Sequence, residues 1–241
     1  MLLLTTPVLW LNEGKSLGFK EIAVIIAALN EEQGIGPTLA ELREVLPEMA
    51  YVVVDGRSSD RTVEVAKELG ADVLIQRGHG KGSAVSEALS YVNCNPKYIV
   101  FTDGDFTYPS KYILDMVDVL EKNPNVGMVT GNRFNHLLTT AAMKNPFYIG
   151  NRMLSLAQLL LNGVNMNDPL TGLRVVRWKI LENWRPKSRG FDIEAEMNHR
   201  VEDLGYRIQE VSIPYRARLG EKKLKLRHGI AIFRRIIAES L

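Results

Sequence analysis

Tyr98-Ile99-Val100-Phe101-Thr102-Asp103-Gly104-Asp105 is the stretch that decides how this chain folds and where its chemistry lies. Its four leading apolar residues predict a short strand buried on both faces, as in a parallel sheet. Side chains two residues apart in an extended segment point the same way, so Asp103 and Asp105 can share one divalent cation and a diphosphate. The alternative is a plain turn after a strand, since Asp and Gly both favour turns.

The order of apolar run, polar loop and helical pattern recurs along the first half of the chain. Strands are predicted over residues 21–28, 51–54, 71–75 and 98–101. Helices are predicted over 37–46 and 61–69, a third helix ends at about residue 91, and a fourth begins after Pro109. This alternation predicts an α/β fold with a doubly wound, mostly parallel sheet. The polar residues that follow the strands are Asn30, Glu31, Asp55, Asp60, Lys81, Asp103 and Asp105. Parallel strands would bring them to one rim, which predicts a nucleotide or phosphate site.

The alternation breaks down past residues 126–130. A helix is predicted over 146–162, a strand over 171–178, a helix over 192–204 and a strand over 206–213. No repeat and no low-complexity linker divides the chain. We therefore expect one domain over residues 21–241 behind an N-terminal arm of residues 1–20. Within it, residues 21–130 are expected to form a nucleotide-binding half, and 131–241 an acceptor half with a basic tail.

Composition is typical of a globular protein, with 46% hydrophobic and 24% charged residues in 241. The formal net charge is only +2, but residues 216–235 carry eight Lys and Arg against one acid, Glu221. This tail predicts an anionic partner. Nucleic acid is not expected, because the basic run contains few aromatic residues. The single cysteine, Cys94, excludes an intramolecular disulfide, fits a reducing compartment and is given no role.

No segment is predicted to span a membrane. The apolar start, residues 1–11, is shorter than the roughly 20 residues a spanning helix needs, and no basic region precedes it. We expect a strand or packing arm there, in a cytoplasmic protein. The apolar positions of residues 147–161 are interpreted as core, with a lipid groove as the alternative. The basic amphipathic pattern of residues 229–237 predicts peripheral contact with the cytoplasmic face of a membrane.

Taken together, the motifs resemble the family 2 nucleotide-sugar glycosyltransferases, and among them the polyprenyl-phosphate sugar synthases, which include the dolichol-phosphate mannose synthases. The resemblance covers roughly residues 22–237. The motifs that occur in the family's order are Ala27-Ala28-Leu29-Asn30-Glu31, residues 55–60, Gly80-Lys81-Gly82, Asp103-Gly104-Asp105, Gly131-Asn132-Arg133-Phe134, Asp168-Pro169-Leu170-Thr171-Gly172, residues 190–194, and Ile213-Pro214 with residues 216–225. The chain departs from the family pattern at Ala27, Leu29, Gly56-Arg57 and Thr107. Those departures leave the base contact and part of the metal coordination open.

The resemblance implies a GT-A type, Rossmann-like domain with a C-terminal acceptor-side extension. It implies transfer of a sugar from a nucleoside diphosphate to a polyprenyl (dolichyl) phosphate, with inversion at the anomeric carbon and with Mg²⁺ or Mn²⁺. GDP-mannose is the expected donor, and UDP-glucose and UDP-N-acetylglucosamine are alternatives. A soluble phosphorylated acceptor is one rival, and a non-catalytic nucleotide-binding or membrane-scaffold subunit is another. A membrane protein partner or a homo-oligomer also stays open.

The resemblance also assigns roles to residues of this chain. The metal ligand would be Asp105 with Asp103, and the catalytic set Asp103, Asp105, Arg133 and Lys81. The donor nucleotide would contact Ala27, Leu29, Asn30, Glu31, Asp55, Gly80, Lys81, Asp103 and Gly104. The acceptor phosphate would contact Arg133, Arg216, Arg218 and Lys223. Asp168, Asp192 and Glu194 would orient the sugar hydroxyls or the arginines. Solvated surface charge is the alternative for the cations, and an ordinary structural ion pair is the alternative for the three acids.

Overall fold

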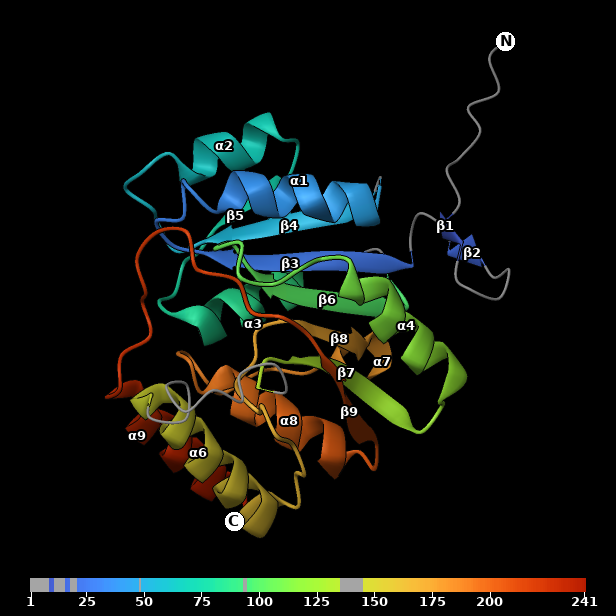
Figure 1. Cartoon of the computed structure of the whole chain (residues 1–241), viewed down its shortest axis with the longest axis vertical. Helices are drawn as coiled ribbons and strands as arrows, with labels where there is room; N and C mark the ends of the chain where they lie inside the picture. Colours follow the sequence, from blue (N-terminus) through green and yellow to red (C-terminus); the bar gives the residue numbers. More distant parts are fainter. Residues whose placement is uncertain (1–8, 11–15, 18–20, 48, 93–94, 135–144) are drawn as a thin grey trace.

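A seven-stranded sheet runs through the middle of the molecule (Figure 1). The computed structural model describes residues 9–10, 16–17, 21–47, 49–92, 95–134 and 145–241. The strands are β3 (Ile22–Ala28), β4 (Ala50–Asp55), β5 (Asp72–Ile75), β6 (Tyr98–Asp103), β7 (Val126–Asn132), β8 (Arg174–Arg177) and β9 (Arg207–Ser212). Their order is β5-β4-β3-β6-β8-β7-β9, and every neighbouring pair is parallel except the two that β8 makes. The expected mostly parallel sheet is therefore confirmed.

The register of the central strands brings their carboxyl ends to one rim. Asp103 on β6 lies opposite Ala27 on β3, and Ala28 lies opposite Asp55 on β4. Chain segments far apart in the sequence therefore leave the sheet at the same level. This is the arrangement that the polar residues after the strands predicted.

Helices cover both faces of the sheet. Their bounds are α1 (Ile35–Val45), α2 (Thr62–Glu68), α3 (Lys81–Tyr91), α4 (Tyr112–Lys122), α6 (Pro146–Asn162), α7 (Trp178–Leu181), α8 (Ile193–Asp203) and α9 (His228–Ala238). Helices α1, α2 and α4 form one core with Val24 and Ile26 of β3. Helices α3, α7 and α8 form the other core, with Ala23 and Ile25 of the same strand. The alternation of β3 side chains between two cores explains its unbroken apolar sequence.

An outer layer made of α6 and α9 packs on α8 (Figure 1). Leu154 of α6 and Ile232 and Ile236 of α9 are buried around Ala195 of α8. These two helices extend the domain on the side of the predicted acceptor half. The division into a nucleotide-binding half and an acceptor half stays a prediction.

Two expectations from the sequence are wrong in detail. The strand predicted over residues 171–178 is only Arg174–Arg177, because the guanidinium of Arg174 donates to Thr171 O at 2.8 Å and Pro169 O at 2.7 Å and holds the preceding loop out of the sheet. The core interpretation of residues 147–161 is wrong for the outer side of α6, where Met153 is 68% and Leu160 is 73% exposed.

The expected N-terminal arm is described only in part. Leu9–Trp10 (β1) and Ser16–Leu17 (β2) form a short antiparallel pair, separate from the main sheet. The rest of residues 1–20 and Cys94 lie outside the described residues. The expectations for them stay predictions.

The start of α1 touches the acid loop so closely that only glycine fits. A Cβ on Gly34 would lie 2.6 Å from Gly104 O and 2.7 Å from Asp105 Cα. We expect Gly34→Ala to lower the free energy of unfolding by about 1–3 kcal/mol through overpacking, as measured by urea denaturation. The matched control is Gly150→Ala in α6, where an added Cβ meets nothing within 4 Å outside the helix backbone. It is expected to stabilise by roughly 0.5–1 kcal/mol, and equal losses in both variants would contradict the close approach.

Candidate active site

The acid pair lies where β6 ends and the chain turns across the rim of the sheet. Asp105 is 2% exposed, and its Oδ1 accepts hydrogen bonds from Thr107 Oγ1 at 2.6 Å and Thr107 N at 3.1 Å. Phe106 between them has a φ of 64°, a left-handed conformation that bulky residues rarely adopt. The turn therefore holds the Asp105 carboxylate through the backbone N–H and the hydroxyl of Thr107.

Asp103 is held from the other side by a lysine. Lys81 Nζ lies 2.6 Å from Asp103 Oδ1 and 2.7 Å from Glu194 Oε1. Burial alone would lower the pKa of Lys81, but the charges of Asp103 and Glu194 outweigh it and raise the pKa well above its usual value. Lys81 is therefore a permanent cation between two acids. Its expected role at the donor diphosphate stays a prediction.

The glycines around Lys81 are needed for packing. Gly82 N donates to Gly190 O at 3.0 Å, and a Cβ on Gly80 would lie 2.5 Å from Arg189 O. Gly80 also has a φ of 85°, which favours glycine. The Gly-Lys-Gly motif thus lets the loop before α8 approach the start of α3, and this contact sets where the Lys81 side chain points.

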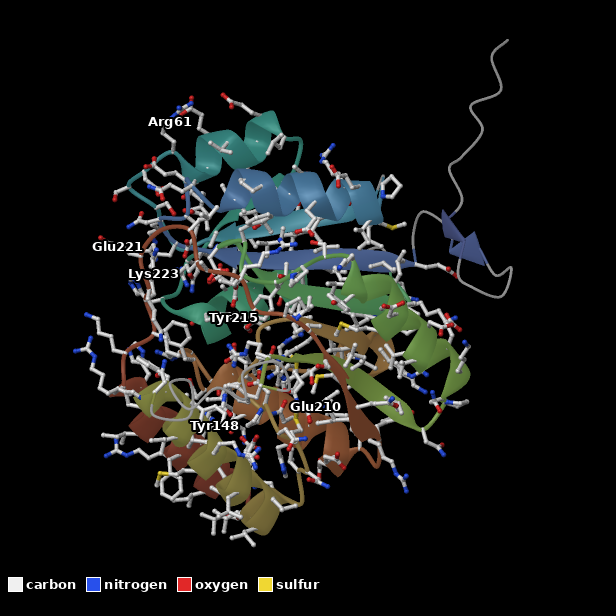
Figure 2. All side chains as sticks on the ribbon, in the orientation of Figure 1. Arg61, Tyr148, Glu210, Tyr215, Glu221 and Lys223 are labelled. Carbon is white, nitrogen blue, oxygen red and sulfur yellow. The ribbon has the colours of Figure 1, made fainter. Side chains whose placement is uncertain are left out.

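A basic segment, residues 215–223, crosses the acid rim, and we call it the basic strap. Its backbone bonds directly to the acid loop, through Arg216 N to Thr107 O at 3.1 Å and Leu219 N to Asp105 O at 3.2 Å. Figure 2 shows the strap with Tyr215 over the middle of the rim and Lys223 toward its outer end. The strap joins β9 to α9, so a segment from late in the chain closes over the loops that follow β3 and β6.

The strap cations are paired with the acids beneath them. Arg218 Nη1 donates to Asp105 Oδ2 at 2.6 Å, and its other terminal nitrogen donates to Glu31 Oε1. Lys223 Nζ donates to Asn30 O at 2.8 Å and lies 3.2 Å from Glu31 Oε1. One guanidinium therefore bridges the loop after β3 and the loop after β6.

Glu31 is the acid with the most unusual environment. It is 5% exposed, and its backbone N donates to Thr62 Oγ1 at 2.8 Å. Burial raises the pKa of Glu31 to about 7, although the charges of Arg218 and Lys223 act in the opposite direction. Its Oε2 is buried and has no hydrogen-bond partner among the described residues. An acceptor oxygen without a partner, next to the acid pair, is available to a ligand.

The acid pair fits a divalent cation that a substrate helps to hold. Among the described residues, no group of three or more His, Cys, Asp or Glu side chains is arranged to bind a metal ion. Asp103 and Asp105 would supply two carboxylates, and Mg²⁺ at nucleotide sites is usually held by one or two carboxylates, phosphates and water. Burial first, and then the charge of Asp103, raises the pKa of Asp105. The carboxylate therefore requires a positive charge beside it, which Arg218 provides in this structure.

Arg133 and Asp168 form a second, more deeply buried pair. Arg133 Nε lies 2.6 Å from Asp168 Oδ2, and Nη2 lies 2.7 Å from Oδ1. Asp168 is 0% exposed and also accepts from Asn151 Nδ2 at 3.0 Å. Burial opposes the charge of Arg133, but Asp168 outweighs it and raises the pKa of Arg133 well above its usual value. Asp168 thus holds the guanidinium of Arg133 through two hydrogen bonds, while the roles expected for both residues at the substrate stay predictions.

The remaining predicted residues are placed as follows. Arg216 makes a bidentate ion pair with Glu41, both bonds at 2.7 Å, and Asp192 lies 3.4 Å from Arg235. Asp55 accepts from Ser58 N at 2.9 Å, so its carboxylate shapes the turn after β4. Leu29 is 40% exposed at the end of β3, while Ala27 lies within that strand and Gly104 in the acid loop. The structure brings the acids, Lys81, Arg218 and Lys223 together, and it leaves Asp192 under α9.

Three residues that contribute to this architecture carried no usable sequence signal. Glu41 is one of several charged positions on α1, and Glu210, which accepts from Asp168 N at 2.8 Å, lies on an edge strand. Tyr108 follows the acid pair closely, and its hydroxyl accepts from Gly172 N at 2.7 Å and Arg133 Nη1 at 3.3 Å. Only its closeness to Asp105 in the sequence could have indicated a role.

Comparison with known proteins gives this geometry a family. Residues 23–184 match the family described as Glycosyl transferase family 2. The chain belongs to glycosyl transferase family 2. It is therefore a glycosyltransferase. It is 35% identical over 208 residues to a dolichyl-phosphate hexose transferase of Haloferax volcanii, covering 86% of this chain and 87% of that protein. It is 25% identical over 219 residues to a dolichol-phosphate mannosyltransferase of Pyrococcus furiosus, covering 85% of this chain and 59% of the relative.

Solved structures agree with the fold. A glucosyl-3-phosphoglycerate synthase of Mycobacterium tuberculosis, in complex with Mg²⁺ and UDP, superposes with a TM-score of 0.69 at 22% identity, covering 91% of this chain and 78% of that one. The complex of that synthase with Mn²⁺, UDP and its glucosylated product has a TM-score of 0.68 at 21% identity and the same coverage. The expected GT-A type α/β domain is confirmed. In the part of the chain that the structure describes, no helix is long and apolar enough to cross a membrane.

The Arg133–Asp168 pair generates a stability prediction. Asp168→Ala would leave the Arg133 charge without its partner, so we expect a loss of about 3–5 kcal/mol in the free energy of unfolding. Glu64→Gln is the control, since it removes the partner of Arg61 in an exposed ion pair and is expected to cost at most about 1 kcal/mol. Urea denaturation of both variants provides the measurement. A similar, small effect in both would show that the buried pair is not structural.

Proposed function

We propose that this family 2 enzyme transfers a hexose from a nucleoside diphosphate to a polyprenyl phosphate, with dolichyl phosphate as the representative acceptor. The observation that carries the proposal is the cationic strap laid across the acid pair, because it puts phosphate-binding residues beside carboxylates suited to a metal–diphosphate. The dolichyl-phosphate hexose transferase of Haloferax volcanii, which is similar over most of both chains, supports the acceptor class. We further propose a peripheral position at a membrane surface, where such an acceptor resides.

In the proposed reaction an oxygen of the acceptor phosphate attacks the anomeric carbon of the sugar. The bond from that carbon to the diphosphate oxygen breaks, the nucleoside diphosphate leaves with the bonding electrons, and the configuration inverts. An acceptor phosphate is already ionised at neutral pH, so the chain needs no strong general base. A Mg²⁺ or Mn²⁺ ion at Asp105, with Asp103, would neutralise the charge that develops on the leaving diphosphate.

The residues of the chain divide between donor and acceptor in this proposal. Glu31 offers its unpartnered Oε2 to the donor nucleotide, next to Asn30, Leu29 and Ala27 on one side and Asp55 on the other. Lys81 holds Asp103 in place and so acts through that carboxylate. Gly80 and Gly104 give the backbone room where the loops meet. None of these roles requires a side chain to leave its position.

The acceptor phosphate is assigned to the strap and to Arg133. Guanidinium forks match phosphate oxygens, so Arg218 can exchange its bonds to carboxylates for bonds to phosphate. Lys223 lies 3.2 Å from Glu31 Oε1, the oxygen that also binds Arg218, and it too can exchange this carboxylate for a phosphate. Arg216 is held by Glu41, and Arg133 is oriented by Asp168. Two further acids hold other cations: Asp192 pairs with Arg235, and Glu194 pairs with Lys81. Arg218 is the cation best placed to respond when substrates bind.

The acid pair is tested by removing one charge. We expect Asp105→Asn to lower kcat by about 10²-fold or more, because the leaving diphosphate loses its main electrostatic support. The amide has nearly the same size, and Arg218 keeps its bond to Glu31, so the circular dichroism spectrum and the melting temperature should change little. Asp118→Asn, which affects a surface pair with Lys122 on α4, is the control. Full activity of Asp105→Asn with sugar nucleotide and Mg²⁺ or Mn²⁺ would contradict the proposal.

Donor and acceptor are tested together with purified protein alone. GDP-mannose with Mg²⁺ or Mn²⁺ is expected to raise the melting temperature more than UDP-glucose or UDP-N-acetylglucosamine, since a ligand that binds the native state stabilises it. With the matching labelled donor and dolichyl phosphate, the label should move into the organic phase on extraction. Label that stays in water with a phosphorylated small acceptor would favour the soluble-acceptor alternative. No transfer without an added protein would favour a subunit that needs a partner.

A further inference from the structure

Helix α6 exposes most of its large apolar side chains and buries several polar ones. Apart from Leu154, the buried side chains of this helix are polar, since Asn151, Ser155 and Gln158 are 5%, 8% and 1% exposed. These side chains are satisfied by the protein, for example Gln158 Nε2 by Ala195 O at 3.0 Å. A surface helix of a globular protein normally has the opposite arrangement, with its apolar side toward the core. The polar interior of α6 leaves its apolar residues to face outward.

The outward side of α6 is a continuous apolar stripe. Ile149, Met153, Leu156 and Leu160 follow at helical spacing and are 48%, 68%, 55% and 73% exposed. Residues that recur three or four apart lie on one face of a helix. Isolated exposed leucines are ordinary on protein surfaces, but a contiguous stripe marks a contact surface.

Helix α9 continues the stripe beside α6. Its Ile230, Phe233 and Ile237 are 60%, 45% and 39% exposed, while Ile232 and Ile236 face α8. At the start of α6, Lys222 of the strap lies 3.1 Å from the ring centroid of Phe147. The C-terminal ends of the two helices are joined, because Asn162 Nδ2 donates to Ile236 O at 3.1 Å. Figure 1 shows them side by side at the edge of the molecule. Since both rest on α8, their outer sides form one surface, which we call the α6/α9 apolar face.

The charges of α6 and of residues 222–238 are all positive, and the acids Glu221 and Glu239 stand just outside that range. Helix α6 contains one charged residue, Arg152, and residues 222–238 contain six Lys and Arg and no acid. Within the described part of the chain, Lys225, Arg227 and Arg234 are exposed and make no ion pair. Apolar side chains bordered by free cations are the pattern of helices that lie in the interface of an anionic bilayer. A second copy of this chain would bring like charges together, which disfavours a dimer through this face.

We propose that the α6/α9 apolar face is the surface by which this protein docks on a lipid bilayer that contains anionic headgroups. The stripe enters the boundary between headgroups and acyl chains, and the cations of α9 and of the segment before it contact lipid phosphates. The basic strap leads directly into this segment, so docking brings the acid rim to the level of the headgroups. The link to catalysis rests on the proposed function, whereas the docking itself does not.

The test is flotation of the full-length chain, without sugar nucleotide, with vesicles of phosphatidylcholine or of phosphatidylcholine mixed with phosphatidylglycerol. We expect the wild-type protein to float with the mixed vesicles and to be released by high salt. Leu156→Glu with Leu160→Glu should lower the bound fraction at least about tenfold, because both leucines would otherwise leave water for the bilayer. Arg227→Gln with Arg234→Gln should remove most of the preference for the anionic vesicles.

A matched control shows whether the effect belongs to this face. Tyr91→Glu with Leu204→Glu changes two exposed apolar residues at the ends of α3 and α8, and it should float like the wild type. All variants are compared by circular dichroism. Equal flotation of the α6 and control variants, or no flotation of the wild type, would overturn the proposal. So would a wild-type dimer, seen by sedimentation, that the α6 substitutions convert to a monomer.

Failure of the docking surface and failure of the proposed function are distinguishable. A water-soluble, short-chain prenyl phosphate requires no bilayer, so the α6 double variant should transfer sugar to it at the wild-type rate. Transfer to dolichyl phosphate in mixed vesicles should fall with the bound fraction. The enzyme could fail to use a prenyl phosphate of either length while vesicles still bind the wild type and not the α6 variant. That result would support the docking surface and contradict the lipid acceptor.

Discussion

Two carboxylates lie close together where a parallel strand ends, Asp105 almost fully buried and Asp103 partly buried, and they require positive charge close by, which other segments of the chain supply. Asp105 is almost fully buried, and the guanidinium of Arg218 compensates its charge across a separation of 113 residues. Lys81 does the same for Asp103. A buried charge without a partner is costly, so the loops that carry these cations are held where the carboxylates need them. The path of the basic strap and the position of the start of α3 satisfy this constraint.

In the proposed reaction, the same constraint would let the site respond to substrates. Arg218 bonds to both Asp105 and Glu31, and each of these bonds can be replaced by a bond to phosphate. A cation that already neutralises the acids costs little to move when another positive charge takes its place beside them. Arg133 differs, because Asp168 is fully buried and holds it through two parallel hydrogen bonds. Arg218 and Arg133 thus differ in how firmly the fold fixes them.

Much of the fold could be predicted from local patterns. The bounds of α6 agree with the prediction because its end signals are strong: Asn145 accepts from Phe147 N at 2.9 Å, Pro146 opens the helix, and Gly163 ends it with a φ of 71°. The polar residues after β3, β4 and β6 also meet at one rim, as parallel strands require. The strand around Arg174 was predicted too long, because a buried arginine bonding backwards to its own loop leaves no periodic signal. Glu41 was missed because its partner Arg216 lies 175 residues away.

The sequence by itself determined the order of strands and helices, the placement of two acids after a buried strand, and the family motifs around them. These features depend on the spacing of apolar and polar residues that are close in the sequence, and this spacing can be read without the structure. Only the tertiary structure decided which cation neutralises which acid and which side of α6 faces water. Helical periodicity separates an apolar side from a polar side but does not say which one is buried. That choice was made by the partners of Asn151, Ser155 and Gln158, which lie in α8 and the loop after α6.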